Sequence, residues 1–299
     1  MEIVTEPDFA SPQEAKIFLH ELRLIARYLG ISDADMEKGH LRCDANISLR
    51  KRDEAGNIVG AKFNPKTEIK NLNSFRHVER ALAYEIDRQT RVWEEDGHPQ
   101  AVSMTRGWDD ARGRTVEQRS KEDAADYRYF PEPDIPALAL AHIAEEMRTQ
   151  MPELPAARRA RFEAEYALRP SDARQICDDS VLADFAERTF SELAAWMDST
   201  LQGDAEGEAY EKQKAQMGRL VSGWLLSKLL GLMADRSIDI RLLKITPENF
   251  AEFITLIATK KLNNTTGLKV LEIMLESADD PTHILEEQSL GQMDDAGEA

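Results

Sequence analysis

Hydrophobic and polar residues alternate almost without a break between Leu41 and Arg50. One face of such a strand carries the apolar side chains of Leu41, Cys43, Ala45, Ile47 and Leu49. The other face carries Arg42, Asp44, Asn46, Ser48 and Arg50. This pattern predicts a half-buried strand with a polar turn after it. Residues 58–63 and 66–72 predict two further strands, and 101–108 with 115–121 predict a hairpin.

Helical spacing dominates elsewhere. The segment Ser11-Pro12-Gln13-Glu14 predicts a helix start, with Ser11 as N-cap, and Gly30 predicts its end. A second long helix is predicted from a cap at Asn73 or Ser74 to about Glu95. From residue 142 to 243 nearly everything predicts helix, with interruptions at Pro152, Pro155, 170–172 and 203–207. Residues 246–249 open another helix with good capping chemistry.

These elements predict a fold class of α+β followed by all-α. The expected domains are an α+β domain with an antiparallel-rich sheet over 1–140, an all-α helical domain over 141–245, and a partial helical tail over 246–299. Residues 126–134 place three aromatics, one arginine, three carboxylates and two prolines in nine positions. Proline restricts its own backbone and that of the preceding residue, so this segment predicts a rigid extended strap that closes the first domain.

Composition narrows the function classes. The 299 residues are 42% hydrophobic and 31% charged, which is ordinary for a soluble globular protein. No apolar run approaches a membrane span, the N-terminus does not resemble a signal peptide, and two cysteines are too few for a disulfide scaffold, so a cytoplasmic protein is expected. The net charge of −17 argues against non-specific nucleic-acid binding as the whole function, but allows a local basic patch.

The sequence lacks the motifs of the commonest self-contained enzymes. It has no GxGxxG, Walker loop, HExxH or GxSxG motif. The polar face of the 41–50 strand fits either a solvated face with local ion pairs or the floor of a site for an anionic ligand. Residues 67–74 run from a strand into a helix N-terminus, where free N–H groups together with Lys70 and Asn71 favour phosphate. Ordinary capping by Asn73 or Ser74 explains the same residues equally well.

Three acidic positions raise the possibility of a metal site. Glu2 and Glu6 bracket an apolar pair near the N-terminus, and with Asp44 they offer the oxygen ligands that Mg²⁺ prefers. Sequence spacing does not show that these carboxylates converge. Cys43 falls on the apolar face of its strand, which favours a role as buried filler over a role as nucleophile.

Taken together, several segments resemble one family. Residues 1–8, 41–48, 67–74 and 126–134, in this order and spacing, resemble the B subunit of the glutamyl/aspartyl-tRNA amidotransferase, and 151–155 and 245–249 continue the resemblance. It implies a protein that phosphorylates the misacylated Glu or Asp on tRNA(Gln) or tRNA(Asn) with ATP and Mg²⁺, so that ammonia from glutamine can displace the phosphate. It also implies two partners, the amidase (GatA-type) and the small third component (GatC-type) of a heterotrimer.

The resemblance also implies architecture and site residues. The first domain would be part of a cradle, kinase-like domain, and the tail would be YqeY-like. Glu2 is a metal ligand by resemblance, and Asp44 is added from its motif and its polar face. The residues expected to contact phosphate or the aminoacyl end are Lys70, Asn71 and Arg128. The residues expected to contact the cofactor are Asn73, Ser74, Asn46 and Ser48.

The chain also departs from the family pattern. Members carry a long stretch before the position of Met1, with a His-Val-Glu-type strand and a Glu-Glu pair that complete the metal site. The expectation is therefore a chain truncated at both ends and without kinase activity in isolation. The alternative function is a non-catalytic tRNA-binding or assembly fragment of that complex, with Arg158, Arg159 and Arg161 as the basic cluster of interest. A third hypothesis is an unrelated α+β scaffold with a solvated strand face.

Overall fold

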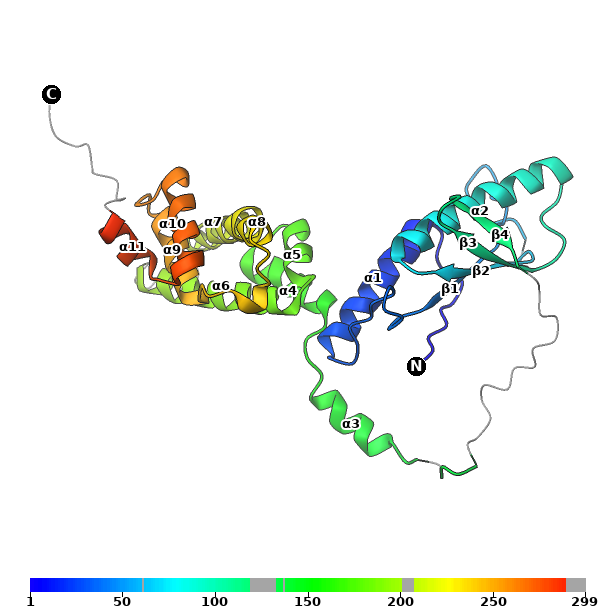
Figure 1. The fold of residues 1–299 in the computed structure, drawn as a ribbon, viewed down its shortest axis with the longest axis horizontal. Helices are drawn as coiled ribbons and strands as arrows, with labels where there is room; N and C mark the ends of the chain where they lie inside the picture. Colours follow the sequence, from blue (N-terminus) through cyan, green and yellow to red (C-terminus); the bar gives the residue numbers. More distant parts are fainter. Residues whose placement is uncertain (61, 119–132, 137, 201–206, 289–299) are drawn as a thin grey trace. The chain divides into compact units, whose positions relative to one another are not determined.

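The computed structural model describes residues 1–60, 62–118, 133–136, 138–200 and 207–288 (Figure 1). The chain divides into two compact units, Met1–Pro152 and Glu153–Ala299. Over the described residues, no helix combines the length and hydropathy needed to cross a bilayer. The finer division into three domains at 140 and 245 stays a prediction.

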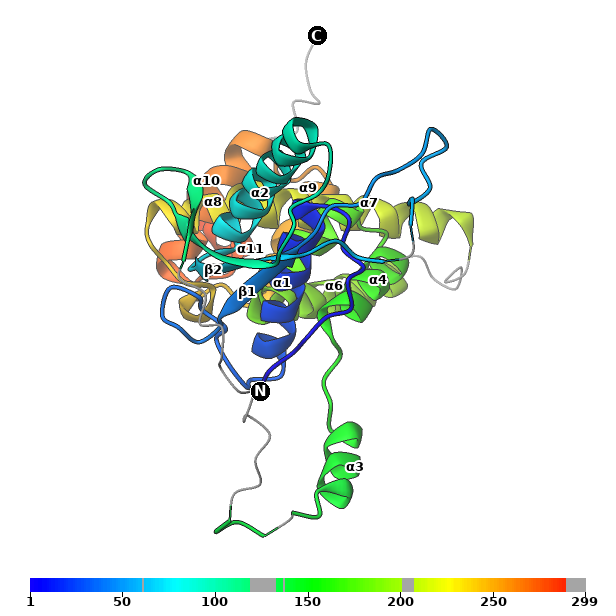
Figure 2. The ribbon, with the colours of Figure 1, turned by 90° about the vertical axis from the view of Figure 1, so that its right-hand side faces the viewer.

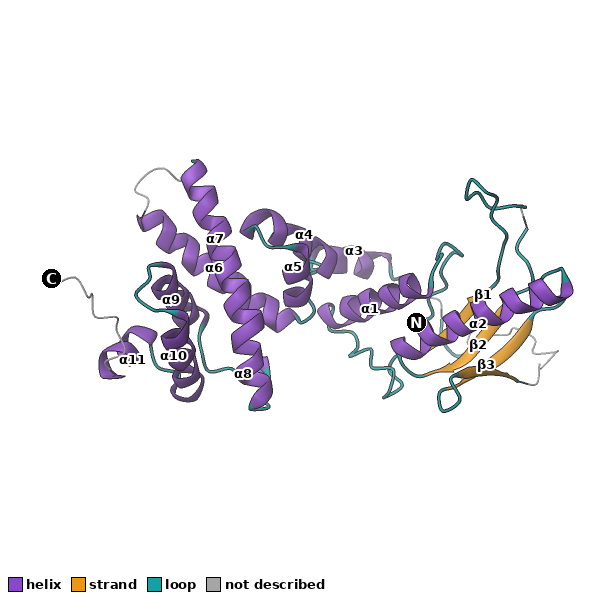
Figure 3. Cartoon of the chain, turned by 90° about the horizontal axis from the view of Figure 1, so that it is seen from above, coloured by secondary structure: helices purple, strands orange, loops and turns teal. Residues whose placement is uncertain are grey.

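The first unit contains a four-stranded sheet in the order β1-β2-β3-β4, whose strands are labelled in Figure 1. Figure 3 shows β1, β2 and β3 side by side. Its strands are β1 (Cys43–Ile47), β2 (Thr67–Leu72), β3 (Met104–Asp109) and β4 (Arg114–Glu117). The outer pairs β1–β2 and β3–β4 are antiparallel, whereas β2 and β3 are parallel. A helix lies between β2 and β3 in sequence, and parallel neighbours require such a crossover. The predicted α+β class is therefore correct in outline, with a mixed sheet.

Two helices accompany the sheet, α1 (Pro12–Tyr28) and α2 (Phe75–Asp96). Helix α1 begins at Ser11 as predicted, where Ser11 Oγ accepts from the Glu14 N–H at 3.2 Å. Of the two predicted candidates for the cap of α2, Asn73 and Ser74, the structure uses Ser74, whose Oγ accepts from the His77 N–H at 3.1 Å. Helix α1 packs along α2 (Figure 2), and α2 packs on one face of the sheet. Their shared core consists of Leu19, Ile69, Leu72, Val78, Ala81, Leu82 and Trp108.

The predicted strand at 58–63 is wrong for its described residues. The segment has only an isolated bridge between Arg52 and Ile58, and Val59 and Phe63 are exposed. Gly56 and Gly60 adopt positive φ and turn the chain on either side of Ile58 and Val59. Within the part of the chain that the structure describes, the segment pairs with a neighbour only through that bridge. β1 is also shorter than the predicted 41–50 strand.

Most of the predicted strap at 126–134 lies outside the described residues, and only its last two residues fall within them. After it comes α3 (Ala141–Thr149), whose residues are all exposed. The role of the strap in closing the first domain therefore stays a prediction.

The second unit is entirely helical in its described part. Its elements are α4 (Pro155–Tyr166), α5 (Pro170–Cys177), α6 (Ser180–Thr200), α7 (Glu208–Trp224), the π-helical turn η1 (Leu225–Leu229), α8 (Leu230–Asp235), the 3₁₀ turn η2 (Ile240–Leu242), α9 (Pro247–Ala258), α10 (Asn264–Ser277) and α11 (Pro281–Gln288). Pro155, Pro170 and Pro247 each open a helix, because proline lacks the N–H that the first turn leaves unpaired. One apolar core extends from Phe162 to Ile284.

Candidate functional site

The face of the sheet opposite α2 carries the polar residues that the sequence singled out. Cys43, Ala45 and Ile47 pack against the core under α2, so strand alternation turns Asp44 and Asn46 to the other face. In β2, Thr67 and Ile69 are buried on the α2 side, which turns Glu68 and Lys70 the opposite way. We call this second surface the open face.

Three strands contribute to one cluster on the open face. Lys70 Nζ lies 3.5 Å from Asp44 Oδ2 and 3.2 Å from Glu68 Oε1. The Thr105 hydroxyl of β3 donates to Glu68 Oε2 at 3.2 Å. The side chains of Asp44, Lys70 and Glu68 keep 53%, 41% and 33% exposure, so a ligand can reach all three. The structure thus brings together Asp44 and Lys70, as a site on this face requires.

Electrostatics keep Lys70 charged. Partial burial acts to lower the pKa of the Lys70 ammonium, but the hydrogen bond from Lys70 to Glu68 and the charge of Asp44 outweigh it. The pKa of Lys70 is therefore raised above its ordinary value, and the side chain is a cation over the whole physiological range. Lys70 therefore offers a permanent positive charge to an anionic ligand. The two accessible carboxylates beside it, Asp44 and Glu68, can attract a cation.

Asn71 has an unusual backbone beside Lys70. Its φ of 63° is left-handed, and the β1–β2 register is irregular opposite this end of β2. A Cβ placed on Gly107 would lie 2.2 Å from Gln118 Nε2 and 3.0 Å from Asn71 Nδ2. The two amide side chains therefore lie close above the Gly107 backbone, and a glycine leaves them that room.

The remaining predicted residues are placed less decisively. The Ser74 hydroxyl is used as the cap of α2, which is the capping alternative that the sequence left open. Asn73 is exposed between β2 and α2, Asn46 is exposed on β1, and Ser48 is half-buried just after it. Arg128 lies outside the described residues. The roles proposed for these residues stay predictions.

The assignment of Glu2 and Asp44 as metal ligands stays a prediction. Glu2 is exposed ahead of α1, and the described residues contain no group of three His, Cys, Asp or Glu side chains that could hold an ion. Asp44 and Glu68 nevertheless present two carboxylates to the same lysine. Mg²⁺ in phosphate-transfer sites is commonly held by one or two carboxylates together with substrate phosphates and water, so this pair fits part of such a site.

Three residues of the cluster were missed by sequence reasoning, namely Glu68, Thr105 and Gly107. For Glu68 a signal existed, because it lies two residues before Lys70 on a strand and must share its face. For Thr105 and Gly107 the sequence carried no such signal. Their approach depends on the parallel pairing of β2 with β3, which matches Glu68 with Thr105 and Lys70 with Gly107.

Cys43 is unsuited to nucleophilic chemistry. Burial, with a smaller contribution from the charge of Asp44, raises the pKa of its thiol to about 11. A thiol with this pKa is almost entirely protonated near neutral pH. Its apolar contacts in the sheet core agree with the predicted role as filler.

The arginines of α4 form a second charged cluster, in the helical unit. Arg158 Nη2 lies 2.6 Å from both Asp184 and Glu187 of α6. Arg161 Nη2 lies 2.7 Å from Glu153 and from Glu187. These acidic partners neutralise both side chains, so Arg158 and Arg161 fasten α4 to α6 and do not present a bare basic surface.

Comparison with known proteins found two matching family models and several curated relatives. A family model described as the GatB/GatE catalytic domain matches residues 1–146, and one described as the GatB domain matches 208–299. The aspartyl/glutamyl-tRNA(Asn/Gln) amidotransferase B subunit of Persephonella marina is 39% identical over 299 residues, which are 100% of this chain and 57% of that protein. The protein of the same name from Thermomicrobium roseum is 40% identical over 296 residues, 99% of this chain and 55% of its own length.

A third relative, the B subunit of Carboxydothermus hydrogenoformans, is 38% identical over 299 residues, 100% of this chain and 56% of its own length. The chain thus spans a little more than half the length of the curated relatives it matches. The first family model lies within the first structural unit, and the second covers residues 208–299 of the second unit. The chain belongs to the family of aspartyl/glutamyl-tRNA amidotransferase B subunits.

Proposed function

We propose that this chain acts in tRNA-dependent amide transfer, as its relatives' name describes. The γ-phosphoryl group of ATP would pass to a carboxylate oxygen of Glu on tRNA(Gln) or Asp on tRNA(Asn), giving an acyl phosphate and ADP. Ammonia from glutamine would then attack the acyl carbon, phosphate would leave, and a proton lost from nitrogen would complete the amide. The partners would be the GatA-type amidase, the small GatC-type component and the tRNA.

The observation that supports this proposal is the Asp44–Lys70–Glu68 cluster on the open face. Transfer of a phosphoryl group to a carboxylate brings several negative charges together, and fixed positive groups are the main protein contribution to such a step. Lys70 supplies one fixed charge at a defined place, because two carboxylates on two strands hold its ammonium. The Asn71 amide, close above Gly107, lies next to it in sequence and offers N–H donors.

ATP with Mg²⁺ is the cofactor that the proposal requires. Asp44 and Glu68 would hold the ion, with Glu2 as a further proposed ligand, and the bound ion would neutralise charge on the phosphates. Lys70 would then exchange part of its contact with these carboxylates for a phosphate oxygen. Its ammonium is positioned for this because its two carboxylate partners flank it and remain solvent-accessible.

The decisive experiment changes Lys70 to Met in the complete amidotransferase complex. The Lys70→Met variant should lower the rate of Gln-tRNA or Asn-tRNA formation about 100-fold, the usual effect of removing one charge-stabilising group. A matched control is Lys16→Met, because Lys16 is similarly exposed and pairs with Glu79 between α1 and α2. Unchanged amide transfer in Lys70→Met would refute the assignment of this cluster.

A second variant tests the carboxylates. Asp44→Asn, alone and together with Glu2→Ala, should reduce ATP-dependent phosphorylation while leaving tRNA binding in place. If amide transfer is unchanged in both variants while tRNA still binds, the catalytic assignment fails and the non-catalytic tRNA-binding alternative gains. The ion-paired state of Arg158 and Arg161 does not favour that alternative.

A further inference from the structure

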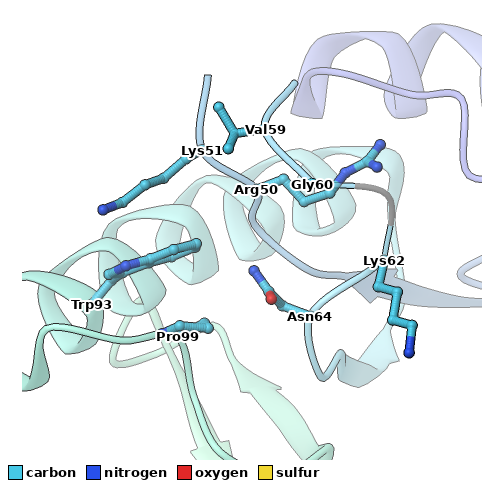
Figure 4. A pocket seen from close by; sticks show the side chains of 8 residues that line it. All are labelled: Arg50, Lys51, Val59, Gly60, Lys62, Asn64, Trp93 and Pro99. Atoms are coloured by element: carbon cyan, nitrogen blue, oxygen red, sulfur yellow. The ribbon is translucent and has the colours of Figure 1, made fainter. Parts of the chain in front are cut away.

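A pocket of about 350 Å³ lies between the segment after β1 and the C-terminal half of α2 (Figure 4). Its lining residues combine three cations, one amide and one indole and include no carboxylate: Arg50, Lys51, Val59, Gly60, Lys62, Asn64, Trp93 and Pro99. We call this the basic pocket. The lining is therefore positively charged, although the whole chain has a net charge of −17. The acidic residues 94–96 at the end of α2 do not line it.

The three cations of the basic pocket have no carboxylate partner among the described residues. Other cations of the same unit do: Lys16 contacts Glu79, and Lys70 contacts Asp44 and Glu68. Arg50, Lys51 and Lys62 make no such contact. Since no carboxylate among the described residues pairs with them, their charges remain available to an anionic ligand.

Aromatic rings lie beside two of these cations. The Arg50 guanidinium carbon is 4.4 Å from the ring centroid of Phe63, and Lys51 Nζ is 5.5 Å from that of Trp93. Phe63 is 55% exposed, and Trp93 is half-buried at the pocket wall. Unpaired cations interleaved with accessible rings are the combination by which proteins bind single-stranded nucleic acid, since the rings stack with bases and the cations contact phosphates.

The cations are spread out along the pocket. Lys51 lies on the Trp93 side of Asn64, whereas Lys62 extends on the other side (Figure 4). A mononucleotide would bring its charge to one place, whereas a strand presents one phosphate per nucleotide along its length. The arrangement therefore favours a short strand over a single nucleotide.

From these observations we propose that the basic pocket binds a single-stranded segment of RNA. One base stacks on Trp93, and successive phosphates contact Arg50, Lys51 and Lys62. The proposal rests on the proposed function, because a tRNA is the RNA that such an enzyme meets. It adds a second RNA contact that is separate in residues from the Asp44–Lys70–Glu68 cluster.

The test measures binding of a fluorescein-labelled uridine octamer to the 299-residue chain by fluorescence anisotropy. Three phosphate contacts predict that the logarithm of the binding constant falls with the logarithm of salt concentration with a slope of about −2. The double variant Lys51→Gln/Lys62→Gln should make this slope shallower by about 1.4 and weaken binding at low salt at least about 10-fold. Lys38→Gln removes one positive charge from a lysine outside the basic pocket that pairs with Asp35, and it should bind as the wild type does.

A second pair of variants tests the stacking. Trp93→Leu should weaken octamer binding about 10-fold, whereas Trp93→Tyr, which keeps a ring, should retain most of the affinity. The proposal is overturned if the wild-type chain does not bind the octamer, if Lys51→Gln/Lys62→Gln binds as tightly as Lys38→Gln, or if ATP displaces the octamer at equal concentration.

Failure of this proposal is separable from failure of the proposed function. If the octamer does not bind but Lys70→Met abolishes amide transfer, only the basic pocket is refuted. If octamer binding depends on Lys51 and Lys62 but Lys70→Met leaves amide transfer intact, only the assignment of the Asp44–Lys70–Glu68 cluster as the catalytic site is refuted.

Discussion

The two faces of the one sheet carry the same kinds of side chain in opposite circumstances. On the α2 face, Glu85 is fully buried and lies 2.8 Å from Arg88 Nη2 and 3.3 Å from Arg106 Nε. On the open face, Lys70 lies at 3.2 to 3.5 Å from two carboxylates, and all three side chains keep about a third to a half of their exposure. Both are carboxylate–cation clusters that join neighbouring elements.

The Glu85 cluster and the Lys70 cluster differ in their hydrogen-bond partners and in their exposure to solvent. Thr115 and Gln89 donate further hydrogen bonds to Glu85, while Arg88 also donates to Gln100 at 3.0 Å. Every partner is supplied by the protein, so the buried cluster is complete and holds α2 to β2, β3 and β4. The open cluster is solvated and keeps free coordination positions. Burial therefore separates a structural use of charge from a use that a ligand can engage.

The largest expected effect comes from breaking the buried cluster. Glu85→Ala leaves two partly buried arginines without their carboxylate, and it should lower the free energy of unfolding of the first unit by about 3–5 kcal/mol. Hydrogen–deuterium exchange of peptides from α2 measures the change in this unit directly. Glu94→Ala, an accessible position on the same helix, is the control and should change exchange little. Equal protection in both variants would show that the cluster is not structural.

The arginine cluster of the helical unit should give an intermediate effect. Arg158 is 9% exposed, but its partners Asp184 and Glu187 are more accessible and can be hydrated after its removal. Arg158→Ala should therefore cost about 1–3 kcal/mol in urea unfolding. Arg241→Ala removes an arginine that is 56% exposed and pairs with Asp239, which is 53% exposed, and a loss as large as that of Arg158→Ala would contradict the comparison.

Acid should weaken the buried cluster in a defined direction. Burial acts to raise the pKa of Glu85, but hydrogen bonds from Arg88 and Thr115 and the charge of Arg88 outweigh it and lower the pKa below 4.5. A lowered folded-state pKa means that the stabilisation is present above the unfolded-state value and is lost as the pH falls through the folded-state value. Stability of the first unit should thus fall as the pH is lowered through that window. Glu85→Gln should flatten this slope, and an unchanged slope would assign it to other carboxylates.

The smallest effect on stability is expected at the open cluster. Lys70→Met removes a cation that is 41% exposed, and exposed pairs contribute little because water screens them. Its free energy of unfolding should stay within about 0.5 kcal/mol of the wild type, in contrast to the large loss of amide transfer proposed above. A stability loss comparable to that of Glu85→Ala would mean that the two faces do not differ in the way described.

The helix caps, the helix starts and the alternation of side chains in a strand can be read from the sequence alone. The cap at Ser11, the helix start at Pro247 and the alternation of β1 depend on residues close in the chain, so they are readable without a fold. The same holds for the family, since its motifs are contiguous segments. The strand expected at 58–63 failed because its apolar residues find no neighbouring strand, which local pattern does not report.

Which charged side chains contact one another depends on the tertiary structure. The register of β1 with β2 brings Asp44 to Lys70, and the parallel pairing of β2 with β3 adds Thr105 to Glu68. The packing of α4 against α6 likewise brings Arg158 and Arg161, two residues of the predicted basic cluster, into ion pairs. Such contacts join residues tens of positions apart, and their geometry depends on hydrogen-bond register and burial, which no stretch of sequence carries alone.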